Sequence, residues 1–183
     1  MSRVNVAVVK ASTSDFFSLF DLPKQFSLDQ SMLDARYREV QAQVHPDKFA
    51  QAGDAQRRLS MQWATHANEA YQTLKKPLSR ATYLLQLAGH DVGAASNTAM
   101  PATFLVEQME WREQVMDARS ASNVAGLDML NTKLLAELSM RYAQLKCLLD
   151  DQAWQAASEA VRCLMFLEKL RQDVADAVEA LEE

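Results

Sequence analysis

Residues that break helices are scarce in this chain of 183 residues, and they fall at intervals rather than in clusters. Glycine and proline each occur four times, and the segments between them are rich in Ala, Leu, Met, Glu and Gln, which favour helix. The breakers are Pro23, Pro46, Gly53, Pro77, Gly89, Gly93, Pro101 and Gly126. No segment alternates apolar and polar residues over the length of a strand, apart from a doubtful one at the N-terminus. The sequence therefore predicts an all-α protein.

Two helical segments in the first half of the chain are joined by a short polar connection. The first is expected at 27–44, with Ser27 as its N-cap, because Ser27 begins a capping-box pattern. The second is expected at 54–75. Helices joined in this way form an antiparallel hairpin, and its exposed tip carries the tripeptide His45-Pro46-Asp47.

The first helix of this hairpin carries two stripes of side chains when its residues are spaced about 100° apart. The apolar stripe consists of Leu33, Tyr37, Val40 and Val44, and the polar stripe of Asp34, Arg38, Gln41 and His45. The polar stripe leads directly into the tripeptide. Arg38 is also one turn from Asp34, a spacing at which their side chains can pair.

The second half of the chain predicts a separate helical domain. Residues 89–100 contain two glycines, small polar residues and little that can pack, which is typical of a linker. Three longer helices are expected after it, and connections this short make them an antiparallel three-helix bundle. Their expected ranges are 101–119, 124–149 and 152–181, with Asn123 capping the second and Asp151 the third. The predicted organisation is a tail at 1–13, a first domain at 14–88, the linker, and the bundle at 101–183.

Charge and cysteine content narrow the classes of function. The net charge of −5 divides into +3 for residues 1–90 and −8 for residues 91–183, and the second value disfavours a nucleic-acid partner. Cys147 and Cys163 are the only cysteines, and without a CxxC pair they indicate neither a disulfide framework nor a metal site. No apolar run reaches membrane-spanning length, and the apolar patch at the N-terminus is too short for a secretory signal. A cytoplasmic protein without membrane partner, metal or cofactor is expected.

The first half resembles a J-domain over residues 15–88. The resemblance is carried by spaced blocks: DFFSLFDL at 15–22, HPDKF at 45–49, NEAYQTL at 68–74 and PLSRATYLL at 77–85. It implies a domain that stimulates ATP hydrolysis by a DnaK-type heat-shock chaperone. It also implies that His45, Pro46 and Asp47 carry this contact, with Arg38 and Lys48 as supporting charges. Tyr37 matches a position used for contact in such domains, while its place beside the apolar stripe equally indicates packing.

The hairpin differs from many J-domains in its charge. Its first helix has only Arg36 and Arg38 as basic residues, and Glu39 occupies a position where a base is frequent. Val44 stands before the tripeptide, where many J-domains have an aromatic residue. These differences favour a specialised chaperone partner over a general one.

The whole chain resembles the HscB family, in which a J-domain is followed by a compact acidic helical domain. The segments PLSRATYLLQLAG at 77–89 and TFLVEQMEWREQV at 103–115 carry this resemblance. It implies a co-chaperone of iron–sulfur cluster assembly whose J-domain engages the chaperone HscA and whose bundle binds the scaffold protein IscU. The scaffold-binding positions that it implies are Leu105, Val106, Met109, Glu110, Glu113 and Phe166.

The helix at 101–119 offers two interpretations of these positions. Phe104, Trp111, Val115 and Ala118 fall on one side and form a sufficient core stripe. Leu105, Met109 and Met116 form a second stripe, which either packs against another helix of the bundle or remains an exposed apolar patch. Phe166 can likewise belong to the core or to the site.

Three other functions are open to this sequence. A hydrolase would use His45, Asp47, His66 and His90, but their spacing matches no metal or acid–base motif. A nucleic-acid partner would require interleaved basic and aromatic residues, which are absent. A J-domain co-chaperone of a general DnaK-type chaperone with another client remains the main alternative. Cys147 and Cys163 are better explained as buried cysteines of apolar helices than as cluster ligands, and no enzymatic activity is expected.

Overall fold

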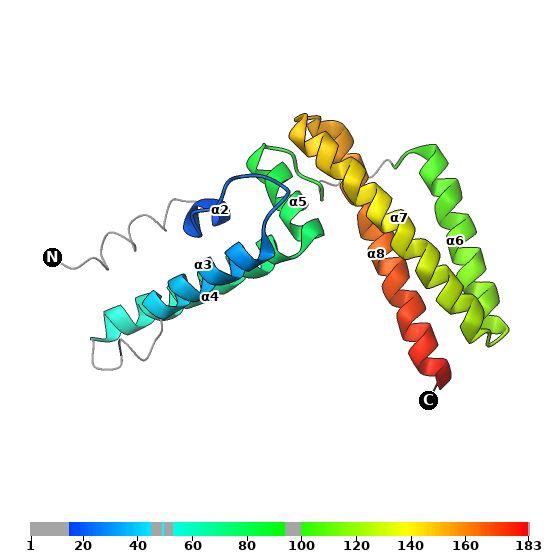
Figure 1. Ribbon diagram of the computed structural model, residues 1–183, viewed down its shortest axis with the longest axis horizontal. Coiled ribbons are helices and arrows are strands. Elements are labelled where there is room, and N and C mark those ends of the chain that lie inside the picture. Colours follow the sequence, from blue (N-terminus) through cyan, green and yellow to red (C-terminus); the bar gives the residue numbers. More distant parts are fainter. Residues whose placement is uncertain (1–14, 45–48, 50–52, 94–99, 183) are drawn as a thin grey trace. The chain divides into compact units, whose positions relative to one another are not determined.

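The computed structural model describes residues 15–44, 49, 53–93 and 100–182, and no strand occurs among these residues (Figure 1). The prediction of an all-α protein is therefore confirmed. The tripeptide His45-Pro46-Asp47, its neighbour Lys48 and the predicted tail at 1–13 lie outside the described residues. So do residues 94–99 of the predicted linker, and the proposed domain boundaries stay a prediction.

The chain forms two compact units that divide between Leu84 and Leu85. The first unit contains α2 (Phe16–Leu19), α3 (Gln30–Val44), α4 (Asp54–Lys75) and most of α5 (Pro77–Leu87). The second contains α6 (Ala102–Ser120), α7 (Val124–Asp150) and α8 (Trp154–Glu182).

In the first unit, α3 and α4 lie side by side and run antiparallel, as the hairpin prediction requires (Figure 1). Aromatic residues of the short α2 close one end of the hairpin. Phe17 and Phe20 are fully buried and pack with the aliphatic side chains of α3 and α4 in a core that consists of Phe17, Phe20, Leu22, Leu33, Ala70 and Leu74. The ring of Phe16 stacks on that of Tyr83 from α5 at 4.4 Å. The aromatic segment at 15–22 thus docks α2 and α5 on the hairpin.

A buried arginine joins α5 to the end of α4. The Arg80 guanidinium donates a hydrogen bond of 2.5 Å to the main-chain oxygen of Leu74, and it also lies over the ring of Phe26 at 5.3 Å. A carbonyl group in the last turn of a helix has no partner within that helix. Arg80 satisfies this group at the point where α4 ends and α5 begins.

The prediction that Ser27 caps the helix expected at 27–44 is wrong. The Asp29 carboxylate accepts hydrogen bonds from the backbone N–H groups of Ser31 at 2.8 Å and Met32 at 3.2 Å, and α3 begins at Gln30. The main-chain oxygen of Ser27 instead accepts a hydrogen bond from the Gln25 side chain at 2.8 Å. Both Ser and Asp are good N-caps, so the path of the chain into the helix decided between them.

In the second unit, α6, α7 and α8 form the predicted three-helix bundle (Figure 1). Its core is mainly aliphatic and includes the fully buried side chains of Leu127, Leu134, Leu145, Val161, Leu164, Leu167 and Val174. Asn123 caps α7 as predicted, because its side chain accepts a hydrogen bond of 2.9 Å from the Gly126 N–H. A Cβ atom at position 126 would lie only 2.6 Å from the Asn123 side chain, so a larger residue there would force the capping side chain to shift.

The connection between α7 and α8 corrects another expectation. Asp151 does not cap α8; it ends α7, and its N–H donates to the main-chain oxygen of Cys147 at 2.9 Å. The next residue, Gln152, has a φ of 56°, and the chain then turns into α8 at Trp154. This tight turn makes α7 and α8 an antiparallel pair.

Candidate functional site

The outer face of α3 holds the charged residues that precede the tripeptide. Arg38 is exposed, and its Nε–H donates to the main-chain oxygen of Asp34 at 3.2 Å rather than to the carboxylate with which pairing was expected. That carboxylate accepts hydrogen bonds from Gln30 at 2.8 Å and from the Tyr71 hydroxyl at 2.9 Å. These two hydrogen bonds lower the pKa of Asp34. The Asp34 carboxylate therefore serves the α3–α4 contact, and the Arg38 side chain lies at the surface.

Tyr37 packs between α3 and α4. Its ring stacks on that of Tyr71 at a centroid distance of 4.1 Å and an interplanar angle of 12°. Its hydroxyl donates to Asn68 at 3.2 Å and accepts from Gln41 at 2.6 Å. A packing role for Tyr37 is thus observed, and a role in partner contact stays a prediction. The stacked tyrosine pair was missed by sequence reasoning, although Tyr71 lies in the NEAYQTL block.

The described residues end at the base of the hairpin tip. α3 ends at Val44, as predicted from the proline two residues later, and α4 begins at Asp54. The side chains of His45, Pro46, Asp47 and Lys48 lie outside the described part of the chain. The structure does describe α3 and α4, the two packed helices that this segment connects.

In the bundle, the second stripe of α6 points away from the core. Leu105, Val106 and Met109 have exposed fractions of 48%, 57% and 72%, while Phe104, Val115 and Ala118 are buried. Trp111, which was assigned to the core stripe, is half-buried. Glu110 and Glu113 are exposed. The alternative in which the second stripe packs against another helix of the bundle is therefore wrong. We call Leu105, Val106, Met109, Glu110 and Glu113 the α6 patch.

Phe166 of α8 belongs partly to the core and partly to the surface beside α6. It is half-buried, meets the ring of Phe104 edge-on at 5.8 Å, and lies under the Arg112 guanidinium at 5.2 Å. It also lines a groove of about 410 Å³ between α6 and α8. Met116, which continues the stripe of the α6 patch, is another wall of this groove and is mostly exposed. The groove therefore extends the exposed apolar surface of α6 towards α8.

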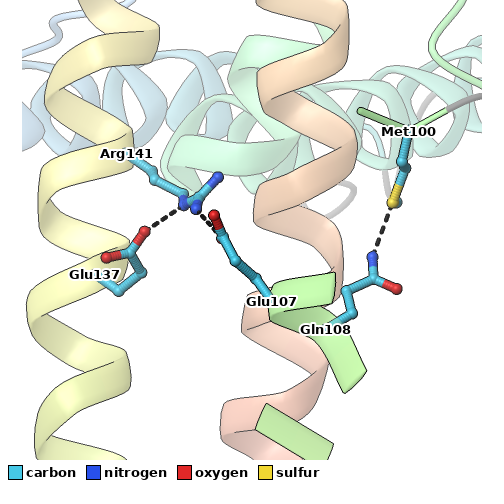
Figure 2. Close-up of polar contacts among 5 residues, drawn as sticks. All are labelled: Met100, Glu107, Gln108, Glu137 and Arg141. Atoms are coloured by element: carbon cyan, nitrogen blue, oxygen red, sulfur yellow. Dashed lines mark hydrogen bonds and ion pairs between the residues drawn. The ribbon is translucent and has the colours of Figure 1, made fainter. Parts of the chain in front are cut away.

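A charged cluster fixes α6 against α7, and sequence reasoning missed it (Figure 2). The Arg141 guanidinium of α7 binds Glu107 of α6 at 2.6 Å and Glu137 of α7 at 2.5 Å, and it lies over the Phe104 ring at 4.8 Å. Near the start of α6, the Gln108 amide donates to the sulfur of Met100 at 2.8 Å (Figure 2). The i,i+4 spacing of Glu137 and Arg141 was visible in the sequence, but their link to Glu107 depends on how the two helices pack. This cluster fixes which side of α6 faces the core.

The described residues contain no group of three or more His, Cys, Asp or Glu side chains that could hold a metal ion. His66 contacts the rings of Phe16 and Trp63, and His90 that of Trp154. Cys163 is buried as predicted, and burial raises the pKa of its thiol. Cys147 is exposed, so the prediction that it is buried is wrong. The other two members of the hydrolase alternative, His45 and Asp47, lie outside the described residues. None of the helices in the described part of the chain is long and apolar enough to cross a membrane.

Comparisons with known proteins agree with this architecture. Residues 100–175 match a family model described as the HSCB C-terminal oligomerisation domain. The co-chaperone protein HscB homolog of Paraburkholderia xenovorans is 60% identical over 173 residues, which are 94% of this chain and 99% of that protein.

Two solved structures extend the agreement to three dimensions. The chaperone HscB from Vibrio cholerae has a TM-score of 0.82 at 39% identity, over 92% of this chain and 99% of its own. The human co-chaperone protein HscB has a TM-score of 0.83 at 29% identity, over 89% of this chain and 81% of its own. The chain is therefore a member of the HscB co-chaperone family, with an N-terminal J-domain and a C-terminal three-helix bundle.

Proposed function

We propose that this chain stimulates the ATPase of a specialised DnaK-type chaperone of the HscA kind and delivers to it the iron–sulfur scaffold protein IscU, in the cytoplasm. The observation that supports this proposal most is the α6 patch. It exposes three neighbouring apolar side chains at the positions that the family resemblance assigns to scaffold binding. A protein that only stimulated an ATPase would have no use for this surface.

The scaffold contact rests on Leu105, Val106 and Met109 as apolar anchors. The backbone of a helix is already ordered, so binding costs these side chains only their own rotamer freedom. Burying their apolar surface then supplies affinity. Glu110 and Glu113 form an acidic rim, which selects a partner with a basic surface and orients it as it approaches. Phe166, held against Phe104, completes the contact from α8.

The chaperone contact rests on the hairpin tip. His45, Pro46 and Asp47 engage the ATPase and shift it towards its hydrolysis-competent state, with Arg38 and Lys48 as supporting charges. Tyr37 contributes by holding α3 and α4 together. This chain needs no bond chemistry of its own. By binding both partners, it raises the effective concentration of the scaffold at the chaperone.

The test uses two variants that separate the two contacts. His45→Gln is expected to abolish ATPase stimulation of an HscA-type chaperone while leaving the circular dichroism spectrum and scaffold affinity unchanged. The double variant Leu105→Ala with Met109→Ala is expected to weaken scaffold binding by about a hundredfold, because two central apolar anchors are truncated. It should leave scaffold-independent stimulation intact.

The same assays identify a wrong assignment. Full stimulation by the His45→Gln variant would exclude the J-domain mechanism. An unchanged scaffold affinity in the double variant would exclude the α6 patch as the scaffold site. Equal stimulation of a general DnaK-type chaperone and an HscA-type chaperone by the unmodified protein would favour the alternative of a general co-chaperone with another client.

A further inference from the structure

The helix α7 carries a second exposed apolar surface, on the side opposite its core. Its buried side chains are Leu127, Leu130, Leu134, Leu138, Leu145 and Leu149. Eight residues point within about 40° of the opposite direction, at 100° per residue. Two of them, Thr132 and Asp150, are polar or charged and exposed. The other six are apolar or small. They are Ala125, Met129, Ala136, Met140, Ala143 and Cys147, and all six are exposed. We call these six residues the α7 stripe.

This stripe differs from the usual outer face of a surface helix. Single exposed apolar residues are common and need no explanation, but the solvent-facing side of an amphipathic helix is normally charged or polar. Met129 and Met140 have exposed fractions of 64% and 60%. From Ala125 to Cys147 the stripe runs for about 33 Å, at a rise of 1.5 Å per residue. Its residues recur with the spacing of a helix–helix seam.

Two other sides of α7 have partners within the bundle. Arg141 binds Glu107 of α6, and the Tyr142 hydroxyl donates to Glu168 of α8. The leucine face packs in the bundle core. All six residues of the α7 stripe are exposed, so no helix among the described residues of this unit covers the stripe.

We propose that the α7 stripe binds the α7 stripe of a second copy of this chain, with the two helices antiparallel about a two-fold axis. If the axis crosses α7 at residue 138, small side chains in the middle of the stripe meet long ones from the other copy. Ala136 then lies opposite Met140 and Cys147 opposite Met129, which is the alternation of large and small residues that closely packed helices need.

Charge supports the antiparallel direction. The charged residues nearest the seam are Lys133, beside the α7 stripe, and Asp150, at its C-terminal end. A parallel, in-register pair would bring the two copies of Lys133 together, and it would also set Met against Met and Ala against Ala. Like charges in contact disfavour an interface. In the antiparallel pair, Lys133 lies opposite Ala143 and its ammonium group can reach water.

The match to a known family model also favours a second copy of this chain as the partner of the α7 stripe. The family model that matches residues 100–175 is described as an oligomerisation domain and spans all of α7, and that description assigns no face. One helix pair of this length buries less than the roughly 1,600 Å² of a standard stable interface. We therefore expect a reversible dimer with a dissociation constant in the micromolar range or weaker.

Cross-linking of the full-length chain tests the direction of the helices. In the antiparallel pair, the two Cys147 residues of the native protein lie about 27 Å apart, so a short bis-maleimide should not join them. In the Met129→Cys variant, the new thiol lies opposite Cys147 of the second copy, and the same reagent should give a covalent dimer. The control is Glu179→Cys, which places an exposed thiol on α8 and should give none.

Sedimentation velocity over a concentration series tests whether self-association uses the α7 stripe. Met140→Glu places a carboxylate in the apolar seam of both copies and should weaken self-association by at least about tenfold. Leu135→Glu is the matched control, because Leu135 is exposed on the same helix but about 100° away from the stripe. It should leave self-association unchanged.

Several results would overturn the proposal. Monomers at every concentration, with no cross-link in the Met129→Cys variant, would exclude the dimer. A cross-link through Cys147 in the native protein would exclude the antiparallel direction. Loss of self-association in the Leu105→Ala, Met109→Ala variant but not in Met140→Glu would assign the dimer to the α6 patch. Weaker scaffold binding by Met140→Glu without any self-association would assign the α7 stripe to the client.

Discussion

The two units of this protein carry different kinds of recognition surface: a short sequence motif in the first unit and one side of a helix in the second. The first unit carries its motif in the segment between two packed helices, where a proline and two polar residues follow one another in the sequence. The second unit carries the α6 patch on one side of a continuous helix, where the relevant side chains are three or four residues apart. A local motif can be recognised without knowledge of the fold. The exposed side chains of a helix can be identified only after its buried side is known.

The cores behind these surfaces also differ. The first unit has a small core in which aromatic rings dominate, with Phe17 and Phe20 fully buried and two tyrosine rings stacked between helices. The second has a long leucine-rich core shared by three helices. A small core depends more on each of its members, so the first unit should be more sensitive to single substitutions.

Phe17→Ala should give the largest change in unfolding free energy, and it should act on the first unit. Removing a fully buried phenylalanine costs about 3–5 kcal/mol of unfolding free energy, which is a large part of the stability of a small unit. We expect the first unit to unfold at much lower urea concentration while the bundle keeps its transition. Fluorescence of Trp63, measured in a background in which Trp111 and Trp154 are replaced by Phe, would follow the first unit. The circular dichroism of the whole chain would follow both units and so separate the two transitions. A single transition that shifts as a whole would show that the units unfold together.

Arg141→Met tests how strongly α6 depends on its charged cluster. The substitution keeps an apolar stem but leaves Glu107 and Glu137 without their cation, which should cost about 1–3 kcal/mol in thermal or urea unfolding. Lys146→Met is the matched control, because Lys146 pairs only with exposed Asp150 on the same helix. That loss should be clearly smaller than the loss in Arg141→Met, because water screens an exposed pair. Equal effects would show that the cluster adds nothing beyond a surface pair.

Tyr37→Phe separates packing from partner contact in the first unit. The variant keeps the stacked ring but loses the hydroxyl that bonds Asn68 and Gln41, which should lower the unfolding free energy by about 1 kcal/mol. If the tyrosine only packs, ATPase stimulation at saturating concentration will not change. A loss of stimulation larger than the change in stability would make the hydroxyl part of the chaperone contact.

Asp15→Asn should give the smallest effect and one that depends on pH. Burial alone would raise the pKa of the Asp15 carboxyl, but hydrogen bonds from Lys24 and from Ser18 outweigh it and hold this pKa below its ordinary value of 3.8. A carboxylate with a lowered folded-state pKa stabilises the fold fully above its unfolded pKa, and this contribution is lost as the pH falls through the folded value.

The native protein should therefore exceed the Asp15→Asn variant in unfolding free energy at neutral pH by about 0.5 kcal/mol. Asparagine can still cap α2, so the comparison isolates the charge. The difference should shrink as the pH is lowered below about 4. Urea unfolding at a series of pH values measures it. A difference that stays constant down to pH 2 would mean that the carboxylate charge does not contribute.

Much of the secondary structure followed from the sequence, because glycine, proline and capping residues act locally. The predicted range of α4 agrees with the structure, and those of the three bundle helices agree to within one or two residues, as does the Asn123 cap. The errors occurred where two local signals competed. Ser27 and Asp29 were both able to cap α3, and Asp151 could either end one helix or begin the next. In each case the path of the chain through the turn decided.

The sequence by itself determined the helical class, the hairpin with His45-Pro46-Asp47 between its helices, the division into two modules and the family. Tertiary structure decided which stripe of α6 is exposed, that Tyr37 packs on Tyr71, and that Arg141 joins two helices. The physical reason is the same in all three cases. Helical periodicity fixes the angles between side chains on one helix, but the direction of the core is fixed only when other helices pack against it.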